Sequence, residues 1–222
     1  EYLKLYNLIK LIRKNKNFVT YVANTMQHSD LLFSQLKLFK TKINFSNKNK
    51  NFNSLYDTSD YLGRYIKNII INTSPDLVIY QGDTLTTYLS SYYSNLMSIK
   101  SMHIEAGLRT YDYLNPWPEE GIRNSIKNFS TYHCAPTKTS YRNLITEKVD
   151  KKVVRITGNT IVDLLNFAHD RFSFSSKLVT KYKKYIYITI HRRENHGTNL
   201  IKFCEILKQI SKEYQNINFI LP

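Results

Sequence analysis

Residues 77–84 read LVIYQGDT and residues 101–110 read SMHIEAGLRT, and the fold follows from these two stretches. LVIY is a short, uniformly apolar run of the kind that forms a buried strand in a parallel sheet. Gly82 lets the chain leave that strand in a tight turn, because glycine tolerates backbone angles that other residues avoid. Residues 84–97 have helical periodicity, and SMHI reads as the next strand. Strand, helix and strand in this order predict parallel strands joined by a crossover helix.

The same alternation continues on both sides of these stretches. Helical patterns are expected at residues 2–12, 28–40, 60–71, 118–129, 137–147, 160–172 and 199–213. Strand patterns are expected at residues 18–22, 131–135, 153–156, 185–190 and 217–221, with polar loops at 41–56 and 173–183. Strands that alternate with helices, without tandem hairpins, predict an α/β protein whose parallel sheet is covered by helices on both faces. The expected hinge is at residues 158–159, with one domain over residues 1–160 and the start of a second over 161–222.

Composition narrows the function classes. The 222 residues include 32 Lys and Arg against 17 Asp and Glu, which gives a net charge of +15. Such a charge suits a binder of nucleic acid or anionic surfaces, or an enzyme with a small anionic substrate. Lys, Asn, Ile and Tyr are abundant together and the Lys residues are scattered, so we favour a compositional bias over a nucleic-acid footprint. No apolar run reaches the roughly 18–20 residues that a membrane span needs.

Cysteine content and the two ends of the chain carry further expectations. Cys134 and Cys204 lie far apart in the sequence and form neither a disulfide framework nor a metal-ligand pattern. This fits a reducing compartment, and we expect a cytoplasmic protein. The chain begins at Glu1 within a helical pattern and stops at Pro222 directly after a strand pattern. We therefore expect a fragment of a longer protein or a truncated reading frame.

Polar residues that follow the strands are candidates for a site, because ligands of open α/β sheets bind beyond the carboxyl ends of the strands. Gln81 and Asp83 follow LVIY, and Glu105 follows SMHI. Spacing alone favours Asp83 as a helix N-cap over Asp83 as a catalytic group. Glu105 is placed to act as a general base, and the small residues after it let a backbone or a ligand approach. An ion pair between Glu105 and Arg109 explains the glutamate equally well.

The segment NPWPEEGIRN at residues 115–124 places two prolines beside the only tryptophan. Pro118 suits the first turn of a helix. Glu119 and Glu120 suit the start of that helix, because the helix dipole favours acidic residues there. With Arg123 one turn further along, we expect a rigid turn that holds a carboxylate in place.

Another polar group follows the strand pattern at residues 185–190. His191, Arg192 and Arg193 supply three potential cations, and Glu194 comes directly after them. This arrangement suits a diphosphate site, although a solvated basic loop explains it about as well. His28 follows the strand pattern at residues 18–22 in the same topological position. The histidines lack the spacing of zinc ligands, and neither G-x-G-x-x-G nor a P-loop motif is present.

Taken together, these segments resemble the non-hydrolysing UDP-N-acetylglucosamine 2-epimerase family. The matching pieces are QGDT at 81–84, HIEAGLRT at 103–110, PWPEE at 116–120 with Arg123-Asn124, GNT at 158–160 with Asp163, and HRREN at 191–195. They follow one another in the family's order, and the likeness spans nearly the whole chain. TMQH at residues 25–28 is similar to a family element near the amino end. The block from HIEAGLRT to PWPEE is highly specific.

The resemblance implies a GT-B-like fold, in which substrate lies between two Rossmann-like halves. It implies an isomerase that interconverts UDP-GlcNAc and UDP-ManNAc by elimination and re-addition of UDP through a 2-acetamidoglucal, for surface polysaccharide synthesis. No nicotinamide, other cofactor or metal ion takes part. The implied partner is a UDP-sugar, a homodimer is compatible with the family, and neither a membrane span nor nucleic acid is expected.

The resemblance also assigns roles to residues of this sequence. Its catalytic residues are Asp83, Glu105, Glu119, His191 and Lys4. Its substrate-binding residues are Arg123, Gln81, Asn159, Arg192, Glu194 and His28. The alternatives are a truncated, inactive homologue, a relative that acts on another UDP-2-acetamido sugar and, outside the enzymes, a basic nucleic-acid-binding module. Because the carboxyl part of the family's chain is absent, we expect the 222 residues alone to be inactive.

Overall fold

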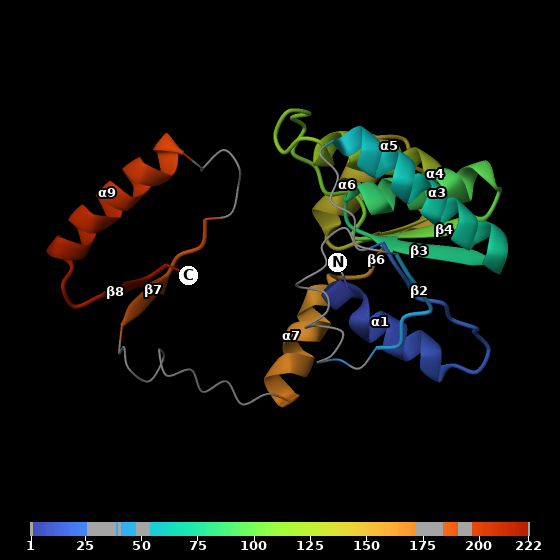
Figure 1. Cartoon of the computed structure of the whole chain (residues 1–222), viewed down its shortest axis with the longest axis horizontal. Coiled ribbons are helices and arrows are strands. Elements are labelled where there is room, and N and C mark those ends of the chain that lie inside the picture. Colours follow the sequence, from blue (N-terminus) through green and yellow to red (C-terminus); the bar gives the residue numbers. More distant parts are fainter. Residues whose placement is uncertain are drawn as a thin grey trace. The chain divides into compact units, whose positions relative to one another are not determined.

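The computed structural model describes residues 2–25, 39, 41–47, 54–171, 184–190 and 197–221. Contacts within the chain divide it into two compact units, Glu1–Ala168 and His169–Pro222 (Figure 1). The domain boundary expected after residue 160 stays a prediction.

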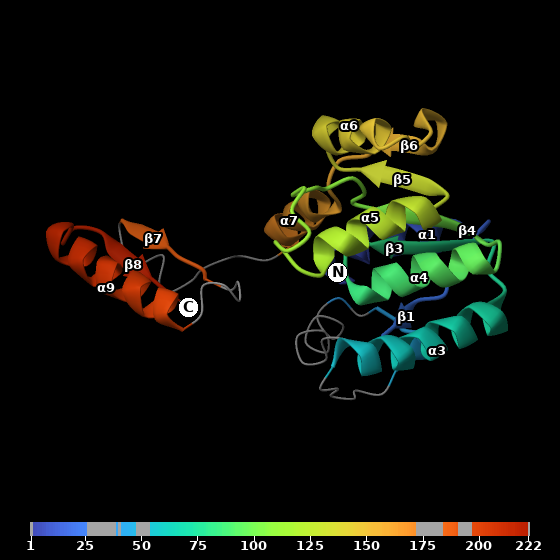
Figure 2. The same ribbon diagram turned by 90° about the horizontal axis from the view of Figure 1, so that it is seen from above.

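The first unit is built on a four-stranded, wholly parallel sheet (Figure 2). Its strands lie in sequence order: β3 (Leu77–Gln81), β4 (Lys100–Ile104), β5 (Tyr132–Ala135) and β6 (Val154–Ile156). Two shorter strands, β1 (Ala23–Asn24) and β2 (Phe45–Ser46), form a separate parallel pair. In the main sheet Gln81 lies opposite Ile104, and Ile104 lies opposite Cys134. The predicted parallel sheet is confirmed.

Helices cover both faces of this sheet (Figure 1 and Figure 2). On one face lie α3 (Leu55–Thr73), α4 (Leu85–Leu96) and α5 (Glu119–Phe129). On the other face lie α1 (Tyr2–Lys14) and α7 (Thr160–Arg171). α6 (Lys138–Thr146) packs against β5 and β6, and a short 3₁₀ turn at Lys151–Val153 precedes β6. The alternation of strands and helices therefore produces the two covered faces that it predicts.

Apolar side chains at helical spacing hold α3 against α4. Leu62, Ile66 and Ile70 recur at every fourth residue of α3, and they are buried together with Leu89 of α4. Each such side chain contributes roughly 1.5–3 kcal/mol when it is fully removed from water. A second buried cluster joins α6 to the sheet and to the loop after β4, and its members are Ala106, Ala135, Leu144 and Val154. The loop after β4 is thus anchored in the core.

Several segments differ from the expectation. FVTYV at residues 18–22 is not a strand: Val19 is 84% exposed, and only Ala23 and Asn24 pair with a neighbouring strand. The loop expected at 41–56 contains β2 and the start of α3, because Ser54 caps that helix by accepting a hydrogen bond from Asp57 N. The strand expected at 185–190 is the shorter β7 (Tyr185–Tyr187). The helix expected at 28–40, apart from residue 39, and the loop at 173–183 lie outside the described residues.

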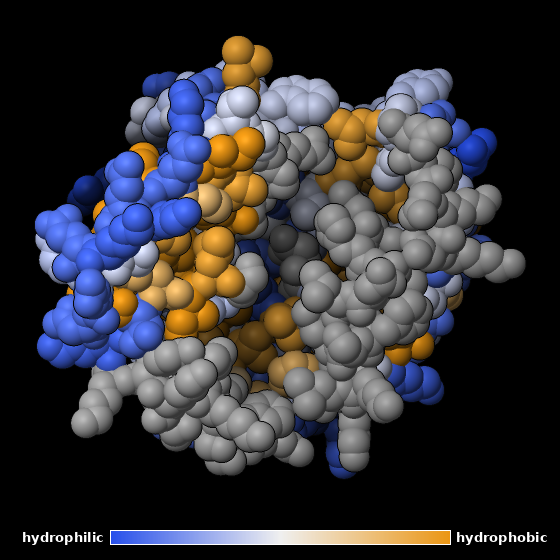
Figure 3. All heavy atoms as spheres, turned by 60° about the vertical axis from the view of Figure 1, so that its left-hand side comes forward, coloured by the Kyte–Doolittle hydropathy of each residue, from blue (hydrophilic) through white to orange (hydrophobic). Residues whose placement is uncertain are grey.

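The second unit contains β7, α9 (Thr198–Glu213) and β8 (Asn218–Ile220), and its two strands pair in parallel. No side chain among residues 184–190 and 197–221 is buried. Ile201 and Ile206 of α9 are 60% and 54% exposed, so this unit presents apolar side chains to solvent (Figure 3). Across the described stretches of the chain, no helix combines the length and the apolar character that crossing a membrane requires.

Candidate active site

The ends of β3 and β4 bring two predicted site residues to one edge of the sheet. Gln81 and Ile104 are register partners at the ends of these strands, so Asp83 and Glu105 follow the sheet at the same edge. Gly82 has a φ of +80°, and its N–H donates to Ile104 O at 3.1 Å. The turn after β3 is thereby tied to the end of β4, at the position where open α/β sheets bind ligands.

Glu105 accepts hydrogen bonds from three other predicted residues. Lys4 Nζ of α1 donates to Glu105 Oε2 at 2.7 Å, and Gln81 Nε2 donates to the same oxygen. Asn159 Nδ2, from the turn before α7, donates to Glu105 Oε1 at 3.1 Å. The Glu105 side chain is only 10% exposed, so the Lys4 ammonium balances a carboxylate that is largely removed from water. We call Lys4, Gln81, Glu105 and Asn159 the Glu105 cluster.

The backbone of Glu105 lies in the left-handed region, with a φ of +68°. This conformation costs a residue with a Cβ roughly 1–2 kcal/mol. The alternative explanation of Glu105, an ion pair with Arg109, is wrong, because Arg109 donates from Nε and Nη2 to Glu147 at 2.7 Å each. Lys127 Nζ joins the same carboxylate at 2.8 Å. Burial alone would raise the pKa of Glu147, but Arg109 and Lys127 hold it below its usual value.

Asp83 binds Arg123 of α5. Arg123 Nη2 lies 2.6 Å from Asp83 Oδ2, and Arg123 Nε donates to that oxygen at 2.8 Å. The cap at the start of α4 belongs to Thr84, whose Oγ1 accepts from Thr87 N at 3.4 Å. The expectation that spacing favours Asp83 as the cap is therefore wrong, and its carboxylate is engaged by a distant arginine instead.

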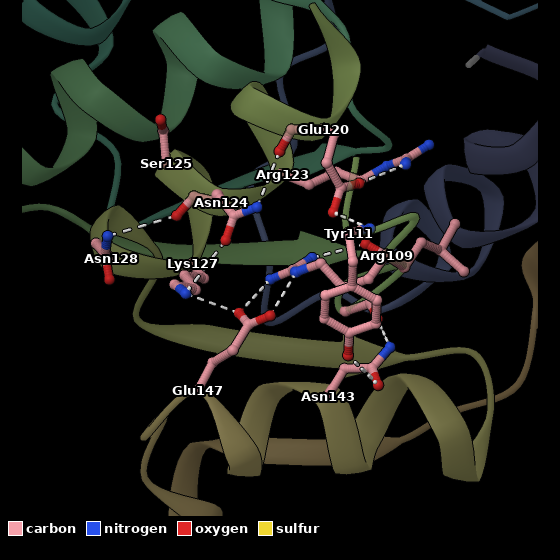
Figure 4. Close-up of polar contacts among 12 residues, drawn as sticks. Arg109, Tyr111, Glu120, Arg123, Asn124, Ser125, Lys127, Asn128, Asn143 and Glu147 are labelled. Atoms are coloured by element: carbon pink, nitrogen blue, oxygen red, sulfur yellow. Dashed lines mark hydrogen bonds and ion pairs between the residues drawn. The ribbon is translucent and has the colours of Figure 1, made fainter. Parts of the chain in front are cut away.

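The two glutamates at the start of α5 have different surroundings. Glu120 is fully buried and accepts from the backbone N–H group of Tyr111 at 3.1 Å (Figure 4). Its other oxygen accepts from Thr110 N at 3.1 Å. Glu120 also binds Arg123 Nη1 at 2.9 Å. Glu119 is half-buried, and its Oε2 is buried without a hydrogen-bond partner in the part of the chain that the structure describes. The turn therefore holds Glu120, a residue that sequence reasoning explained by the helix dipole alone.

These contacts fix the charges around Arg123. Burial alone would raise the pKa of Glu120, but the donors of Thr110, Arg123 and Tyr111 hold it below its usual value. Burial would lower the pKa of Arg123, and the carboxylates of Asp83 and Glu120 raise it instead. Glu120 is thus an anion and Arg123 a cation throughout the neutral range.

The loop after Glu105 packs so closely against α6 that one of its residues must be glycine. Gly107 has a φ of +84°, and a Cβ at this position would lie 2.2 Å from Ser140 O. The Gly107 carbonyl accepts from Asn143 Nδ2 at 2.9 Å. The close approach of backbone that the small residues after Glu105 predict is therefore present.

A buried histidine supports the turn that carries Asp83. His103 Nε2 lies 2.8 Å from Gly82 O, and because a carbonyl only accepts, this nitrogen carries the proton. His103 is a register partner of His133 on β5, and both rings are buried. Burial lowers the pKa of His103 to about 3 and that of His133 to about 4, so both rings are neutral at physiological pH. Sequence reasoning considered these histidines only as metal ligands and missed this role.

The predicted residues therefore fall into four sets. Direct contacts join the members of the Glu105 cluster, and separately Asp83 with Arg123. Glu119 opens the helix that carries Arg123. The remaining predicted residues lie outside the described part of the chain, and they are His28, His191, Arg192 and Glu194. Among the residues that the structure does describe, no three His, Cys, Asp or Glu side chains are grouped to hold a metal ion.

Comparison with known proteins gives consistent matches. A family model described as UDP-N-acetylglucosamine 2-epimerase matches residues 10–222. Curated UDP-N-acetylglucosamine 2-epimerases of Neisseria meningitidis and Escherichia coli are 32% and 34% identical to this chain. Each comparison covers 100% of this chain and 62% of the relative, so the chain spans less than two thirds of the length of these proteins.

Comparison with solved structures gives matches to proteins of the same name. The crystal structure of UDP-GlcNAc 2-epimerase from Neisseria meningitidis bound to UDP-GlcNAc has a TM-score of 0.92 and 31% identity, over 99% of this chain and 62% of that one. The Methanocaldococcus jannaschii UDP-GlcNAc 2-epimerase in complex with UDP-GlcNAc and UDP has a TM-score of 0.81 and 25% identity, over 100% and 63%. The expected fold class, GT-B-like with parallel sheets flanked by helices, is confirmed.

Proposed function

The chain belongs to the UDP-N-acetylglucosamine 2-epimerase family, and from this premise we propose that the protein interconverts UDP-GlcNAc and UDP-ManNAc. Relatives that carry this name are 32–34% identical to the chain, and the solved structure of one of them is bound to UDP-GlcNAc. Because the chain spans 62% of the length of these relatives, the proposal concerns the full-length protein that carries it.

The proposed reaction removes the proton at C2 of the sugar and breaks the bond between C1 and the diphosphate oxygen. The electron pair of the C2–H bond becomes the C1=C2 bond of a 2-acetamidoglucal, and the electron pair of the C1–O bond leaves with UDP. The UDP oxygen then re-adds at C1 while a proton returns to C2 on the opposite face. Since the C2 proton is not acidic, departure of the diphosphate has to develop positive charge on the sugar, and nearby carboxylates stabilise that charge.

One observation supports this chemistry most strongly: the Glu105 cluster and the Asp83–Arg123 ion pair follow neighbouring strands at one sheet edge. Removal and return of a proton on two faces of a ring needs more than one acid–base group. Asp83 and Glu105 supply two carboxylates there, and Glu119 offers a third, with one oxygen that no described residue contacts by a hydrogen bond.

The other predicted residues complete the proposal. Lys4 compensates the charge of Glu105, and Gln81, Asn159 and Arg123 orient the carboxylates that they contact. We propose that His191 acts near the leaving group and that Arg192, Glu194 and His28 bind substrate. Cationic side chains near the leaving group stabilise the negative charge of a departing diphosphate.

The biological setting is also part of the proposal. We propose that the reaction uses no nicotinamide, because elimination and re-addition move a proton and UDP and transfer no hydride. We propose that it uses no metal ion, as the family resemblance implies. We propose a cytoplasmic homodimer that supplies ManNAc units to surface polysaccharides. The free thiols of Cys134 and Cys204 are consistent with a reducing compartment.

The proposal is tested by incubating UDP-GlcNAc with the full-length protein and following products by NMR. UDP-ManNAc should form, and UDP with 2-acetamidoglucal should accumulate as the eliminated pair. A protein that forms none of these is the inactive homologue, and turnover of a different UDP-2-acetamido sugar alone would change the substrate. Assaying the 222-residue chain beside the full-length protein tests the expectation that the chain alone is inactive.

A further inference from the structure

Glu120 is a buried carboxylate outside the predicted catalytic set. Its neighbour Glu119 is half-buried, and one of its oxygens has no hydrogen-bond partner among the described residues. Glu120 is fully buried, and both of its oxygens accept hydrogen bonds. One Glu120 oxygen accepts from Tyr111 N, and the other accepts from Arg123 Nη1 (Figure 4). This second oxygen also accepts from Thr110 N. A carboxylate so enclosed has no room to take part in proton transfer with a sugar. We therefore look for its function in the groups that it binds, which are the end of a loop and the guanidinium of Arg123.

The first thing that Glu120 holds is the far end of the loop that begins at Glu105. Both ends of this loop have left-handed backbone, with a φ of +68° at Glu105 and +60° at Tyr111. Between them the loop is closely packed on α6 through Gly107. At the far end, the N–H groups of Thr110 and Tyr111 both point to the Glu120 carboxylate. Each of these bonds ties an exposed residue of the loop to a fully buried carboxylate, so Glu120 holds the far end of the loop in place.

The second thing that Glu120 holds is the guanidinium of Arg123. Nη1 of this planar group binds Glu120, while Nε and Nη2 bind Asp83. The guanidinium is rigid, so fixing one of its edges fixes the direction of the other. Glu120 therefore sets the orientation in which Arg123 meets Asp83.

We propose that Glu120 is a positioning residue that joins the loop behind Glu105 to the arginine that binds Asp83, and so keeps the two carboxylates in one fixed arrangement. The proposal rests on the proposed function, because it concerns the geometry of that same site. It assigns the adjacent glutamates different roles. Glu119 is an acid–base group of the proposed reaction, and Glu120 fixes the loop and the Arg123 guanidinium in place.

Two Glu120 variants distinguish the effect of the side chain's negative charge from the effect of its length. Glu120→Gln keeps the size of the side chain but places an amide donor against donors, and Glu120→Asp keeps the charge but shortens the side chain. Glu147→Gln is the matched comparison, because Glu147 also binds an arginine of the same loop, Arg109, but has no contact with Arg123 or Asp83.

The first readout is hydrogen–deuterium exchange of the 222-residue chain by mass spectrometry. Both Glu120 variants should lose protection in the peptide that contains Thr110 and Tyr111, and Glu147→Gln should keep it. Protection of that peptide in both Glu120 variants would overturn the proposal, whether or not the chain is active.

The second readout is steady-state kinetics of the full-length protein. Misplacing a reacting group by about 1 Å costs on the order of 100-fold, so Glu120→Gln and Glu120→Asp should lower kcat by about that factor with KM close to wild type. Glu147→Gln should lower Tm and keep kcat. Wild-type kcat in either folded Glu120 variant, or an equal loss of kcat in Glu147→Gln, would overturn the proposal. If the unaltered protein is inactive, the proposed function fails, and the exchange experiment still decides the role of Glu120.

Discussion

Two buried histidines should make the first unit lose stability in mild acid. His103 of β4 and His133 of β5 are register partners and are only 3% and 2% exposed. Burial holds the pKa of His103 at about 3 and that of His133 at about 4, against an ordinary value of 6.5. Between these pKa values and 6.5, the two histidines therefore bind protons in the unfolded chain but not in the folded chain. The stability from these neutral rings is complete above pH 6.5 and is lost progressively as the pH falls toward 4 and then 3.

The size of the loss follows from proton binding. At pH 5 an unfolded histidine with its ordinary pKa is almost fully protonated while the buried ring is still neutral, which lowers the free energy of unfolding by about 2 kcal/mol for each histidine. The pair thus costs about 4 kcal/mol, a large part of the roughly 5–15 kcal/mol that stabilises a typical domain. Carboxylates add little in this window. The lowered pKa values of Glu120 and Glu147 make their contributions disappear only below their ordinary value of 4.5.

The assay is urea unfolding of the chain at pH 7, 6 and 5, followed by circular dichroism. The double variant His103→Gln with His133→Gln should lose most of the pH dependence, because neither amide titrates and the glutamine at 103 can still donate to Gly82 O. His169→Gln is the control, because the His169 side chain is 87% exposed and should leave the pH dependence unchanged. An unfolding free energy that stays constant from pH 7 to pH 5, or a double variant with the full acid loss, would refute this reasoning.

Three further substitutions test the fold and the site. Gly107→Ala should destabilise the chain by about 2–4 kcal/mol, because its Cβ meets Ser140 O at 2.2 Å and its φ is +84°. Gly158→Ala, with a φ of +77° and no atom of the described chain within 4 Å, should cost only about 1 kcal/mol; equal losses in urea unfolding would contradict the close contact at Gly107. Thr84→Ala should cost about 1 kcal/mol by removing the cap of α4, and no loss would return the cap to Asp83.

Position along the chain is the part of the site that could be predicted from sequence. LVIY and SMHI predict neighbouring buried strands. The rule that ligands bind beyond the carboxyl ends of strands then selects Asp83 and Glu105 as site residues. The small residues after Glu105 predict a close approach of backbone, and Gly107 makes it. Local patterns carry this information because strand ends and tight turns are local properties.

Partners could not be predicted in the same way. Glu105 has Arg109 four residues away in sequence, yet its ion pair is with Lys4, 101 residues away. Asp83 has the spacing of a helix cap, yet Thr84 takes that role and Asp83 binds Arg123. Which partner a carboxylate takes depends on how α1, α5 and α7 pack around the sheet edge, and periodicity does not encode that packing.

The same limit explains the strand that was expected at residues 18–22 and is absent. FVTYV has strong strand propensity, but a strand forms only where a neighbour supplies hydrogen bonds, and β2 pairs only with Ala23 and Asn24. The sequence likewise explains Glu120 only by the helix dipole, because nothing in PWPEE distinguishes the glutamate that turns inward from the one beside it.

The most direct test of the account is the fate of the hydrogen at C2 when UDP-GlcNAc turns over in deuterium oxide, compared between the full-length protein and its Glu105→Gln variant. We predict that both epimers acquire deuterium at C2, and that the variant, still folded by circular dichroism, exchanges far more slowly. Products that keep their original C2 hydrogen would contradict the elimination. A variant that exchanges as fast as wild type would remove Glu105, and the sheet edge built around it, from the chemistry.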